Sequence, residues 1–439
     1  MAVIRRKKAV IAGVAVSALA AAALLSGCST GTAGAKCDKP VEITWLGTIK
    51  VEIQDQFTGA IEEYNKTNTD CVTVSIVEAP QDVPFLQTVT PMYEAGKAPT
   101  IMTALQELPD MADKVMDWKG QALTDLAAEG TLDVANINGK QVGLPVTAEA
   151  FGLIYNEDVL SKAGVDATKV NTVDGLKDAF EKIKASGVDP VHFSGLWWSL
   201  GAHFTNIYHT NAADTAEGRL AILDDLKAGK KDLMADPVFK EWLDVFDILK
   251  ANKIASASIA DTDYDTAVEN VATGKAGYWF MGNWAEPNLL TTAPDGKFGL
   301  APVPLSNDAA AKGNNSISVG VPFYIMVDKE QASAEQQAAA VKVLTWFLTT
   351  EAGQKFWAGP VAEGGMSFIP VYKDFKVQPS TMMAKQIADY IAAGNTLQWV
   401  NSAYPAGLQD LYGAAAQKYY DGQIDRAAFA AELQAAWTK

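Results

Sequence analysis

Apolar and polar residues alternate in two short stretches that are separated by a helical stripe. Residues 41–45 and residues 72–76 place apolar side chains at every second position, which is the period of a half-buried strand. Between them, residues 57–64 carry apolar side chains at spacings of four and three, which predicts a helix. A strand, a helix and a second strand in this order predict a parallel sheet, as in α/β proteins.

The same succession of helices and strands continues along the chain. Thr172 is a predicted N-cap of a helix that ends at Gly187, and residues 277–281 form a run typical of a short buried strand. Ser333 and Gln336 have the spacing of a capping box at the start of a further helix. Because the 439 residues exceed one ordinary domain of about 100–200 residues, we expect an α/β chain with two lobes.

The first residues have the composition of an export signal. Residues 1–8 hold four cations and no acid, residues 9–25 are apolar, and small residues lead to Cys28. This pattern is typical of a secretory signal peptide over residues 1–27. A membrane-spanning helix is the alternative, but the run is at the lower limit of about 17 residues and consists largely of weakly apolar alanine.

The ending Leu25-Ser26-Gly27-Cys28 resembles the lipobox of bacterial lipoproteins. The resemblance implies cleavage before Cys28 and lipidation of its thiol, which would hold the protein on the extracellular face of the cell membrane. Residues 28–37 are then expected to be a flexible, lipid-anchored tether, since most of them are small.

Cys37 and Cys71 remain once Cys28 is assigned to the lipid, because the chain has three cysteines. Export places these two thiols in an oxidising compartment, where a pair tends to form a disulfide. We therefore expect a bridge between the entry of the first strand and the entry of the second. Two inert thiols are the alternative.

Composition and motifs argue against several functions. With 36 basic and 52 acidic residues the net charge is −16, which disfavours nucleic-acid binding. The common phosphate-binding, nucleophile-elbow and zinc-protease motifs do not occur, and the three histidines are not spaced as metal ligands. Asp261–Asp265 begins like a calcium loop but has Thr266 and Ala272 where glycine and glutamate are needed. We expect no metal, no cofactor and no catalytic residues.

The distribution of tryptophan and arginine favours a neutral ligand. Trp197, Trp198 and Trp284 occur in polar surroundings where loops follow predicted strands, and an indole is a suitable platform for the apolar face of a sugar ring. Removal of the signal would leave Arg219 and Arg426 as the last two arginines, although arginine is the preferred partner of carboxylates and phosphates. The chain is therefore poorly equipped for an anionic ligand.

Four segments resemble, in the same order, motifs of a known family. They are Asn138–Pro145 (NGKQVGLP), Leu153–Gly164 (LIYNEDVLSKAG), Gly274–Trp284 (GKAGYWFMGNW) and Phe347–Gly353 (FLTTEAG). Over nearly all of residues 41–439 the chain is similar to the extracellular solute-binding proteins of ATP-driven (ABC) importers, in the sugar-binding family related to maltose-binding protein.

The resemblance implies an α/β, periplasmic-binding-protein-like fold. In this fold two discontinuous lobes are joined by hinge strands, and the ligand is held in the cleft between them. Crossings between the lobes are expected near Pro145, Pro302 and Thr350. The expected segments are 38–146 plus 301–350 for the first lobe and 147–300 plus 351–439 for the second.

The resemblance also assigns ligand contacts to positions in both lobes. Trp284 matches the family's stacking aromatic residue, and Glu149 matches a carboxylate that accepts hydrogen bonds from sugar hydroxyls. The other expected contacts are Thr48, Lys50, Gln81, Asp82, Thr103, Gln106, Glu107, Trp197, Trp198, Asn283, Trp399 and Tyr404. Ala104 stands where some maltodextrin binders have an aromatic residue, so no particular sugar is indicated.

These features together favour a monomeric, lipid-anchored receptor that is not an enzyme. It would capture a neutral saccharide and deliver it to the membrane permease of an importer, and the number of candidate stacking tryptophans favours an oligosaccharide. An exported glycan hydrolase is the alternative, since any two of the 52 acids could converge. A receptor for a polyol or a phosphate ester is a further alternative.

Overall fold

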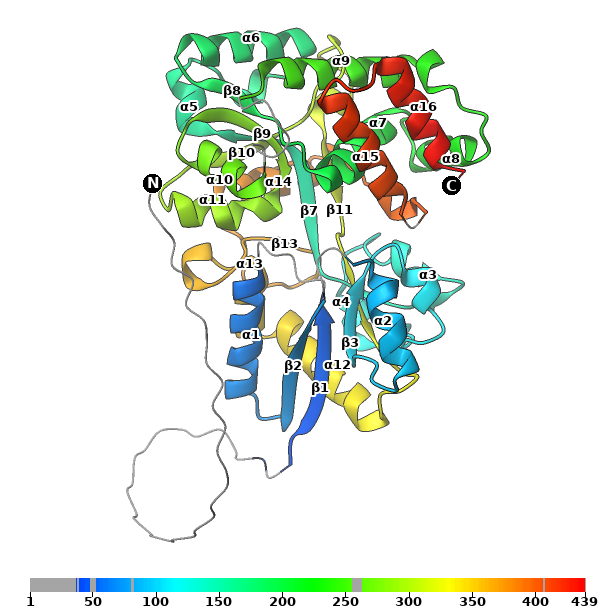
Figure 1. Ribbon diagram of the computed structural model, residues 1–439. Coiled ribbons are helices and arrows are strands. Elements are labelled where there is room, and N and C mark those ends of the chain that lie inside the picture. Colours follow the sequence, from blue (N-terminus) through cyan, green and yellow to red (C-terminus); the bar gives the residue numbers. More distant parts are fainter. Residues whose placement is uncertain are drawn as a thin grey trace, which may run out of the picture. The chain divides into compact units, whose positions relative to one another are not determined.

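The computed structural model describes residues 37, 39–47, 53–79, 83–254, 263–405 and 407–438. The expected signal peptide, the tether before residue 37 and Cys28 lie outside the described residues. Helices and strands alternate along the described chain and form two lobes, each built around a sheet (Figure 1). The mixed α/β fold with two lobes is therefore confirmed.

The first lobe is built on a sheet with the strand order β2-β1-β3-β12-β6. Strand β1 is parallel to β2 and β3, whereas β12 is antiparallel to β3 and β6. The strands are β1 (Val41–Gly47), β2 (Val72–Glu78), β3 (Ile101–Ala104), β6 (Leu144–Pro145) and β12 (Tyr324–Val327). Around them lie the small hairpin β4 (Asn136–Ile137) and β5 (Lys140–Gln141) and the helices α1 (Gln54–Thr67), α2 (Phe85–Glu94), α3 (Leu108–Met111), α4 (Ala122–Leu126), α12 (Ala334–Thr349) and α13 (Glu351–Ala358).

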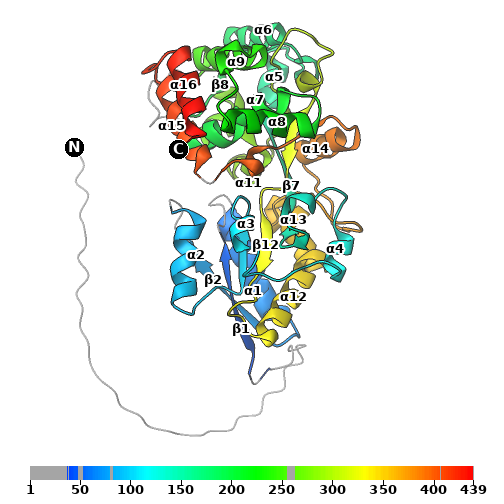
Figure 2. The same cartoon turned by 90° about the vertical axis from the view of Figure 1, so that its right-hand side faces the viewer.

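The second lobe contains the larger sheet, with the order β14-β11-β7-β9-β8 and with β10 and β13 also paired to β7. Its strands are β7 (Thr147–Asn156), β8 (Asp189–His192), β9 (Ala276–Gly282), β10 (Phe298–Ala301), β11 (Ile317–Gly320), β13 (Ile369–Pro370) and β14 (Thr396–Gln398). Its helices, all labelled in Figure 1 and all but α10 labelled again in the turned view of Figure 2, are α5 (Glu157–Lys162), α6 (Val173–Ala185), α7 (Thr205–Asn211), α8 (Ala216–Lys227), α9 (Pro237–Asn252), α10 (Tyr264–Ala272), α11 (Glu286–Thr292), α14 (Met382–Ala392), α15 (Leu408–Tyr420) and α16 (Arg426–Ala436).

The local sequence signals act as predicted. The hydroxyl of Thr172 accepts a hydrogen bond from the Gly175 amide (3.0 Å) and caps α6. Ser333 and Gln336 form the reciprocal capping box at the start of α12. The predicted strand at 277–281 lies inside β9, in which every residue is buried. The side chains of Thr172, Ser333 and Gln336 satisfy backbone amides at the helix starts, which have no partner within their own helix.

Connections between the two sheets are fastened to one another. Strand β6 ends at Pro145 in the first sheet, and β7 begins at Thr147 in the second. The short strand β13 pairs with the beginning of β7, and the hydroxyl of Tyr372 donates a hydrogen bond to the Pro145 carbonyl. Tyr372 is 6% exposed, and burial raises the pKa of its phenol well above the usual value. The connection from β6 to β7 and the segment that carries β13 and Tyr372 are thus joined by backbone and side-chain hydrogen bonds.

Strand β11 lies in a different lobe from the one expected. The sequence expectation places the whole of 301–350 in the first lobe, with a crossing near Pro302. The structure instead pairs β11 with β7 and β14 of the second sheet. The chain changes lobe between Gly320, which ends β11, and Tyr324, which begins β12. Strand pairing, rather than the proline, determines where this crossing lies.

Helix α13 also departs from the expected boundary at Thr350. It was expected in the second lobe but packs on α1 and α12 of the first. The ring of Phe356 lies 6.0 Å from Phe57 of α1 and 5.5 Å from Phe347 of α12, measured between centroids. Thr350 separates two helices by capping α13, so its polar signal marks a turn and not a change of lobe. The apolar side chains of α13 keep it on the first lobe.

A buried carboxyl group links two helices of the second lobe. Glu286, the first residue of α11, is 2% exposed, and Thr381 Oγ1 donates a hydrogen bond to its Oε2 (2.9 Å). Thr381 is also the N-cap of α14. Burial raises the pKa of Glu286 from 4.5 to about 8, against a smaller lowering by the Thr381 hydrogen bond. The carboxyl group is therefore mostly neutral at pH 7 in the folded protein.

The disulfide between Cys37 and Cys71 is present, as predicted, and closes the loop that contains β1 and α1. We expect the double variant Cys37→Ser/Cys71→Ser to lose roughly 3–4 kcal/mol of unfolding free energy, since the bridge restricts the unfolded chain over a loop of this length. Urea denaturation measures the change. Reduction of the unmodified protein should give a similar loss, and an unchanged midpoint in both experiments would contradict the stabilising role.

Glu286 should make stability depend on pH. Between pH 4.5 and about 8 the folded state keeps the proton that the unfolded chain releases, so the unfolding free energy should fall as pH rises through this window. Glu286→Gln cannot ionise, and its decrease should be smaller by an amount on the order of 4 kcal/mol. Urea denaturation across this range measures the slope. Glu335→Gln, at an exposed position of α12, is the matched control and should keep the wild-type slope.

Candidate functional site

Two glycines beside β7 make room for two indole rings. Phe151 of β7 pairs with Gly282 of β9, and Glu149 pairs with Gly320 of β11. A Cβ added to Gly282 would lie 2.0 Å from the ring of Trp284, and one added to Gly320 would lie 2.5 Å from the ring of Trp399. Each indole is therefore in close contact with a glycine backbone, a position that any larger residue would block.

Five rings form what we call the aromatic cluster: Phe151, Trp198, His203, Trp284 and Trp399. The ring of Trp399 stacks on Phe151 with centroids 5.1 Å apart and an interplanar angle of 26°. His203 lies centrally, with centroid distances of 5.0 Å to Phe151, 4.8 Å to Trp284 and 5.7 Å to Trp198. The cluster joins three expected ligand contacts to two residues that the sequence did not single out as contacts.

A π-helical turn positions two members of the cluster. Residues Ser199–Phe204 form this turn, directly after Trp198. Its wider winding brings residues five apart into register, so Trp198 and His203 can meet. The turn packs tightly on α15, because a Cβ on Gly201 would lie 2.2 Å from the Gln409 carbonyl oxygen, and the residue before Trp198 is equally close, with a Cβ on Gly413 2.4 Å from the Trp197 carbonyl oxygen. Gln417 of α15 also donates a hydrogen bond to the Gly195 carbonyl (2.8 Å). The backbone that carries Trp197 and Trp198 is thus fixed.

The expected stacking residues differ in the surface that they offer. Trp284 is 2% exposed and Trp399 is 7% exposed, so other side chains already cover most of both rings. Trp197, by contrast, is 39% exposed, and Trp198 is half-buried. Trp197 and Trp198 are therefore the tryptophans of this region whose faces remain accessible.

Several buried polar atoms next to the cluster have no hydrogen-bond partner in the part of the chain that the structure describes. The Trp399 Nε1 and Asn401 Oδ1 atoms have no hydrogen-bond partner among the residues that the structure describes, and neither has Asn206 Nδ2. Asn206 Oδ1, in contrast, accepts a hydrogen bond from the Val400 amide (3.0 Å). Unpaired buried donors and acceptors are costly, so such atoms are usual places for a bound water or a ligand hydroxyl.

Two further expected contacts lie in the second lobe. Glu149 is 1% exposed within β7, where the strand faces Gly320. Asn283 is equally buried, and its Oδ1 accepts a hydrogen bond from the Ala150 amide (2.9 Å). The amide oxygen of Asn283 is thus used to hold the turn after β9 against β7.

The first lobe contributes residues at the end of β3. Thr103 is within the strand, opposite Ile325 of β12, and is half-buried. The side chain of Gln106 donates a hydrogen bond to the Asn401 carbonyl (3.0 Å), so the end of β3 contacts the segment that carries Trp399. Glu107 is half-buried, and burial raises the pKa of its carboxyl group.

Tyr404 lies apart from the aromatic cluster. It is 3% exposed, and its ring packs 5.5 Å from His209, 5.9 Å from Tyr412 and 5.9 Å from Trp437. Burial raises the pKa of its phenol well above the usual value. Tyr404 is therefore a core residue between α7, α15 and the C-terminal helix. Four other expected contacts, Thr48, Lys50, Gln81 and Asp82, lie outside the described residues.

The two histidines outside the aromatic cluster have structural environments. His192 is fully buried, with Nδ1 at 3.3 Å from the Asn270 amide nitrogen. Burial lowers the pKa of His209 to about 3, so this ring is neutral near pH 7. Within the described part of the chain, no group of three or more His, Cys, Asp or Glu side chains is arranged to hold a metal ion.

Relatives with curated names match parts of the chain. A xylose/arabinose-binding protein, XacG, of Haloferax volcanii is 25% identical over 169 residues, which are 38% of this chain and 35% of that protein. A putative binding protein of Brucella abortus is 25% identical over 272 residues, or 59% of this chain and 56% of its own length. The chain thus matches between about a third and just over half of the length of these relatives.

Solved structures match nearly the whole chain. RafE in complex with raffinose superposes with a TM-score of 0.74 at 18% identity, covering 90% of this chain and 98% of its own. A chitin oligosaccharide binding protein gives 0.73 at 17% identity, covering 91% and 98%. At these identities the likeness establishes the fold.

The family itself is shown by the sequence. The profile of the bacterial extracellular solute-binding proteins matches residues 50–354, which is well over half of the 439 residues. The expected resemblance is thereby confirmed: the chain belongs to the family of bacterial extracellular solute-binding proteins.

Proposed function

We propose that this protein is the substrate-binding lipoprotein of an ATP-driven importer and that it captures a neutral saccharide, with an oligosaccharide favoured. The observation that supports this most directly is the aromatic cluster, in which Trp198 is half-buried, together with the exposed indole of Trp197, the preceding residue in the chain. An indole face stacks on the apolar face of a sugar ring. Trp198 is the candidate platform for one ring, and the exposed Trp197 is the candidate platform for a second.

Polar atoms near the cluster suit the hydroxyls of a sugar. Trp399 Nε1 is a donor and Asn401 Oδ1 an acceptor, and both are buried without a partner among the described residues. The carboxylate of Glu149 and the amides of Gln106 and Asn283 lie in the same region. A few placed polar groups within an aromatic surrounding are what a small-ligand site requires for orientation and specificity.

The arginines outside the signal are both engaged, which disfavours an anionic ligand. Arg219 is 6% exposed and donates hydrogen bonds to the carbonyls of Ala213 and Asp214. Arg426 forms ion pairs with Asp244 (2.7 Å) and Asp247 (2.5 Å). No arginine among the described residues is therefore available to hold a phosphate or carboxylate in the bidentate manner typical of such ligands.

Capture uses contacts from both lobes. A ligand that contacts residues after β3 and the aromatic cluster binds best when both are close, so it shifts the population toward that arrangement. The names of similar proteins agree with a saccharide: XacG is named for xylose and arabinose, and a RafE structure contains raffinose. Relatives of this chain are binding proteins, which supports a receptor and not an enzyme.

We infer that the protein delivers its ligand to a permease while it is attached to the membrane. No helix in the described part of the chain has the length and apolar character needed to cross a bilayer. We infer that Cys28 carries the lipid, that residues 28–37 act as the tether, and that a monomer presents its ligand to the permease from the extracellular face. The lipobox-like sequence before Cys28 supports this arrangement.

Saccharide binding should depend on Trp197. We expect Trp197→Ala to weaken the binding of an oligosaccharide by about 1–2 kcal/mol, because one stacking face is lost, and to leave the melting temperature unchanged, because the side chain is exposed. Calorimetric titration of the purified protein with a panel of mono- and oligosaccharides, polyols and phosphate esters measures this. Leu220→Ala, at an exposed leucine of α8, is the matched control.

The same titration can overturn the proposal. Binding of a phosphate ester with no binding of any saccharide would exclude the saccharide assignment. Release of smaller sugars from a glycan during the titration would indicate a hydrolase instead.

Membrane attachment should depend on Cys28. In cells that export the chain, Cys28→Ala should move the protein from the membrane fraction to the soluble fraction, since the lipid-bearing thiol is gone. Immunoblots of the two fractions measure the distribution. Ser26→Ala, within the same segment, serves as a control that keeps the thiol, and a Cys28→Ala protein that stays with the membrane would exclude lipidation at this residue.

A further inference from the structure

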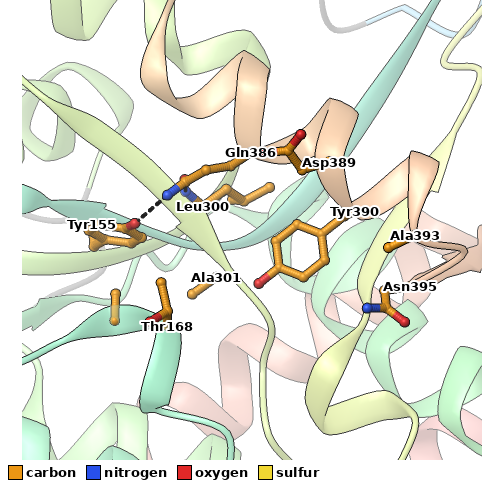
Figure 3. A pocket seen from close by; sticks show the side chains of 10 residues that line it. Tyr155, Thr168, Leu300, Ala301, Gln386, Asp389, Tyr390, Ala393 and Asn395 are labelled. Carbon is orange, nitrogen blue, oxygen red and sulfur yellow. Dashed lines mark hydrogen bonds between the residues drawn. The ribbon is translucent and has the colours of Figure 1, made fainter.

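A cavity lies in the second lobe, at the far end of β7 from the aromatic cluster. It has a volume of about 300 Å³ and lies between the end of β7, β10, the turn at Ala167–Lys169 and α14 (Figure 3). Tyr155 lines it and is four residues beyond Phe151, which corresponds to ~13 Å along a strand. All of its lining residues belong to one lobe, so it does not depend on closure around a ligand in the aromatic cluster.

The polar wall of this cavity is fixed before any ligand arrives. Gln386 of α14 donates a hydrogen bond to the Tyr155 hydroxyl (2.7 Å, dashed in Figure 3) and accepts one from the Leu300 amide (3.0 Å). The ring of Tyr155 lies on Gly299, where an added Cβ would be 2.3 Å from it. Opposite, Thr168 Oγ1 donates to Asp166 (2.6 Å) and keeps its acceptor capacity. A site whose side chains are already held in place loses little conformational entropy on binding.

The remaining lining groups leave hydrogen-bonding capacity for a ligand. The Tyr390 ring stands beside the opening, and its hydroxyl points toward the side of Ala301 (Figure 3). Among the described residues no hydrogen bond occupies that hydroxyl. Asp389 and the Asn395 amide lie at the rim and are exposed. The Tyr155 hydroxyl accepts from Gln386 and can still donate its own proton.

The lining excludes some ligand classes. No lysine or arginine lines the cavity, and the neighbouring Lys169 is paired with Asp166 (2.9 Å), so an anion would lack a counter-charge. The floor is apolar, formed by the side chains of Ala167, Leu300 and Ala301. A volume of about 300 Å³ is at the lower end of small-ligand sites, which argues for a ligand with a single ring.

We propose that this cavity is a second binding site, which holds one neutral monosaccharide ring, of a hexose or a pentose. The apolar face of the sugar lies against Leu300 and Ala301, beside the Tyr390 ring, and its hydroxyls bond to Tyr155, Thr168 and Asn395. The site is independent of the proposed oligosaccharide site at the aromatic cluster, and it takes monosaccharides.

The test fills the cavity from its exposed edge. Ala393, which follows the last residue of α14, is exposed and lines the cavity, whereas the exposed neighbour Ala392 does not line it. Ala393→Trp should therefore block the cavity without disturbing the core, and Ala392→Trp is the matched control. D-glucose, D-galactose, D-xylose and L-arabinose are the probes, each titrated against the purified protein by saturation-transfer NMR. Circular dichroism checks that both variants are folded.

We expect at least one of the four sugars to bind about tenfold more weakly to Ala393→Trp, with no change for Ala392→Trp. The same binding should persist in Trp197→Ala, which separates this site from the aromatic cluster. The proposal is overturned if none of the four sugars binds, or if Ala393→Trp and Ala392→Trp weaken binding equally. It is also overturned if all monosaccharide binding disappears in Trp197→Ala and is unchanged in Ala393→Trp. The last result would leave the proposed oligosaccharide receptor intact.

Discussion

Strand β7 is the element on which both lobes and both candidate sites depend. It pairs with β9, β10, β11 and β13, and all ten of its residues are buried. It begins at Thr147, two residues after β6 of the first sheet ends at Pro145, so one continuous strand leads from the connection between the sheets into the second lobe. A strand paired on both sides has its backbone groups satisfied along its length, and its position cannot shift without breaking several ladders. Side chains placed along β7 are therefore held at fixed distances from the connection between the two sheets.

Glycines on the strands next to β7 determine where aromatic rings can lie against the sheet. Gly282, Gly320 and Gly299 are on strands next to β7, and each is covered by a ring: Trp284, Trp399 and Tyr155 respectively. A side chain at any of the three glycines would collide with that ring. The contacts of Trp284 and Trp399 help to build the aromatic cluster, and the contact of Tyr155 helps to build the wall of the cavity beside α14. The same local device thus produces two surfaces of different character, one with accessible indoles and one with a phenol fixed by a glutamine.

The sequence contained the parts of this structure that depend on local signals. Alternation over residues 41–45 and 72–76, the Thr172 cap and the Ser333 capping box depend on neighbouring residues, and the structure has each of them. The Cys37–Cys71 bridge followed from parity and export and is also present. The lobe boundaries depend on long-range pairing instead. Strand β11 has the short sequence Ile-Ser-Val-Gly, which has too little periodicity to assign it to either sheet.

The candidate site was found in part for the same reason. Trp198, Trp284 and Trp399 meet in one cluster, but Phe151 and His203 were missed, because a buried strand residue and a π-helical turn have no distinctive sequence pattern. The resemblance implies Tyr404 as a contact as well, yet an interior group of three other rings holds it in the core.

The tryptophans of the cluster divide into two roles that composition alone could not separate. Trp284 and Trp399 are covered by His203 and Phe151 and support the cluster from inside. Trp197 and Trp198 are carried by a turn that is locked onto α15 and keep accessible faces. A rigid support beneath an accessible ring reduces the entropy lost when a ligand stacks on it, because the ring does not have to be ordered at the same time. In the proposed saccharide site, the buried Trp284 and Trp399 would therefore favour stacking of a ligand on Trp198.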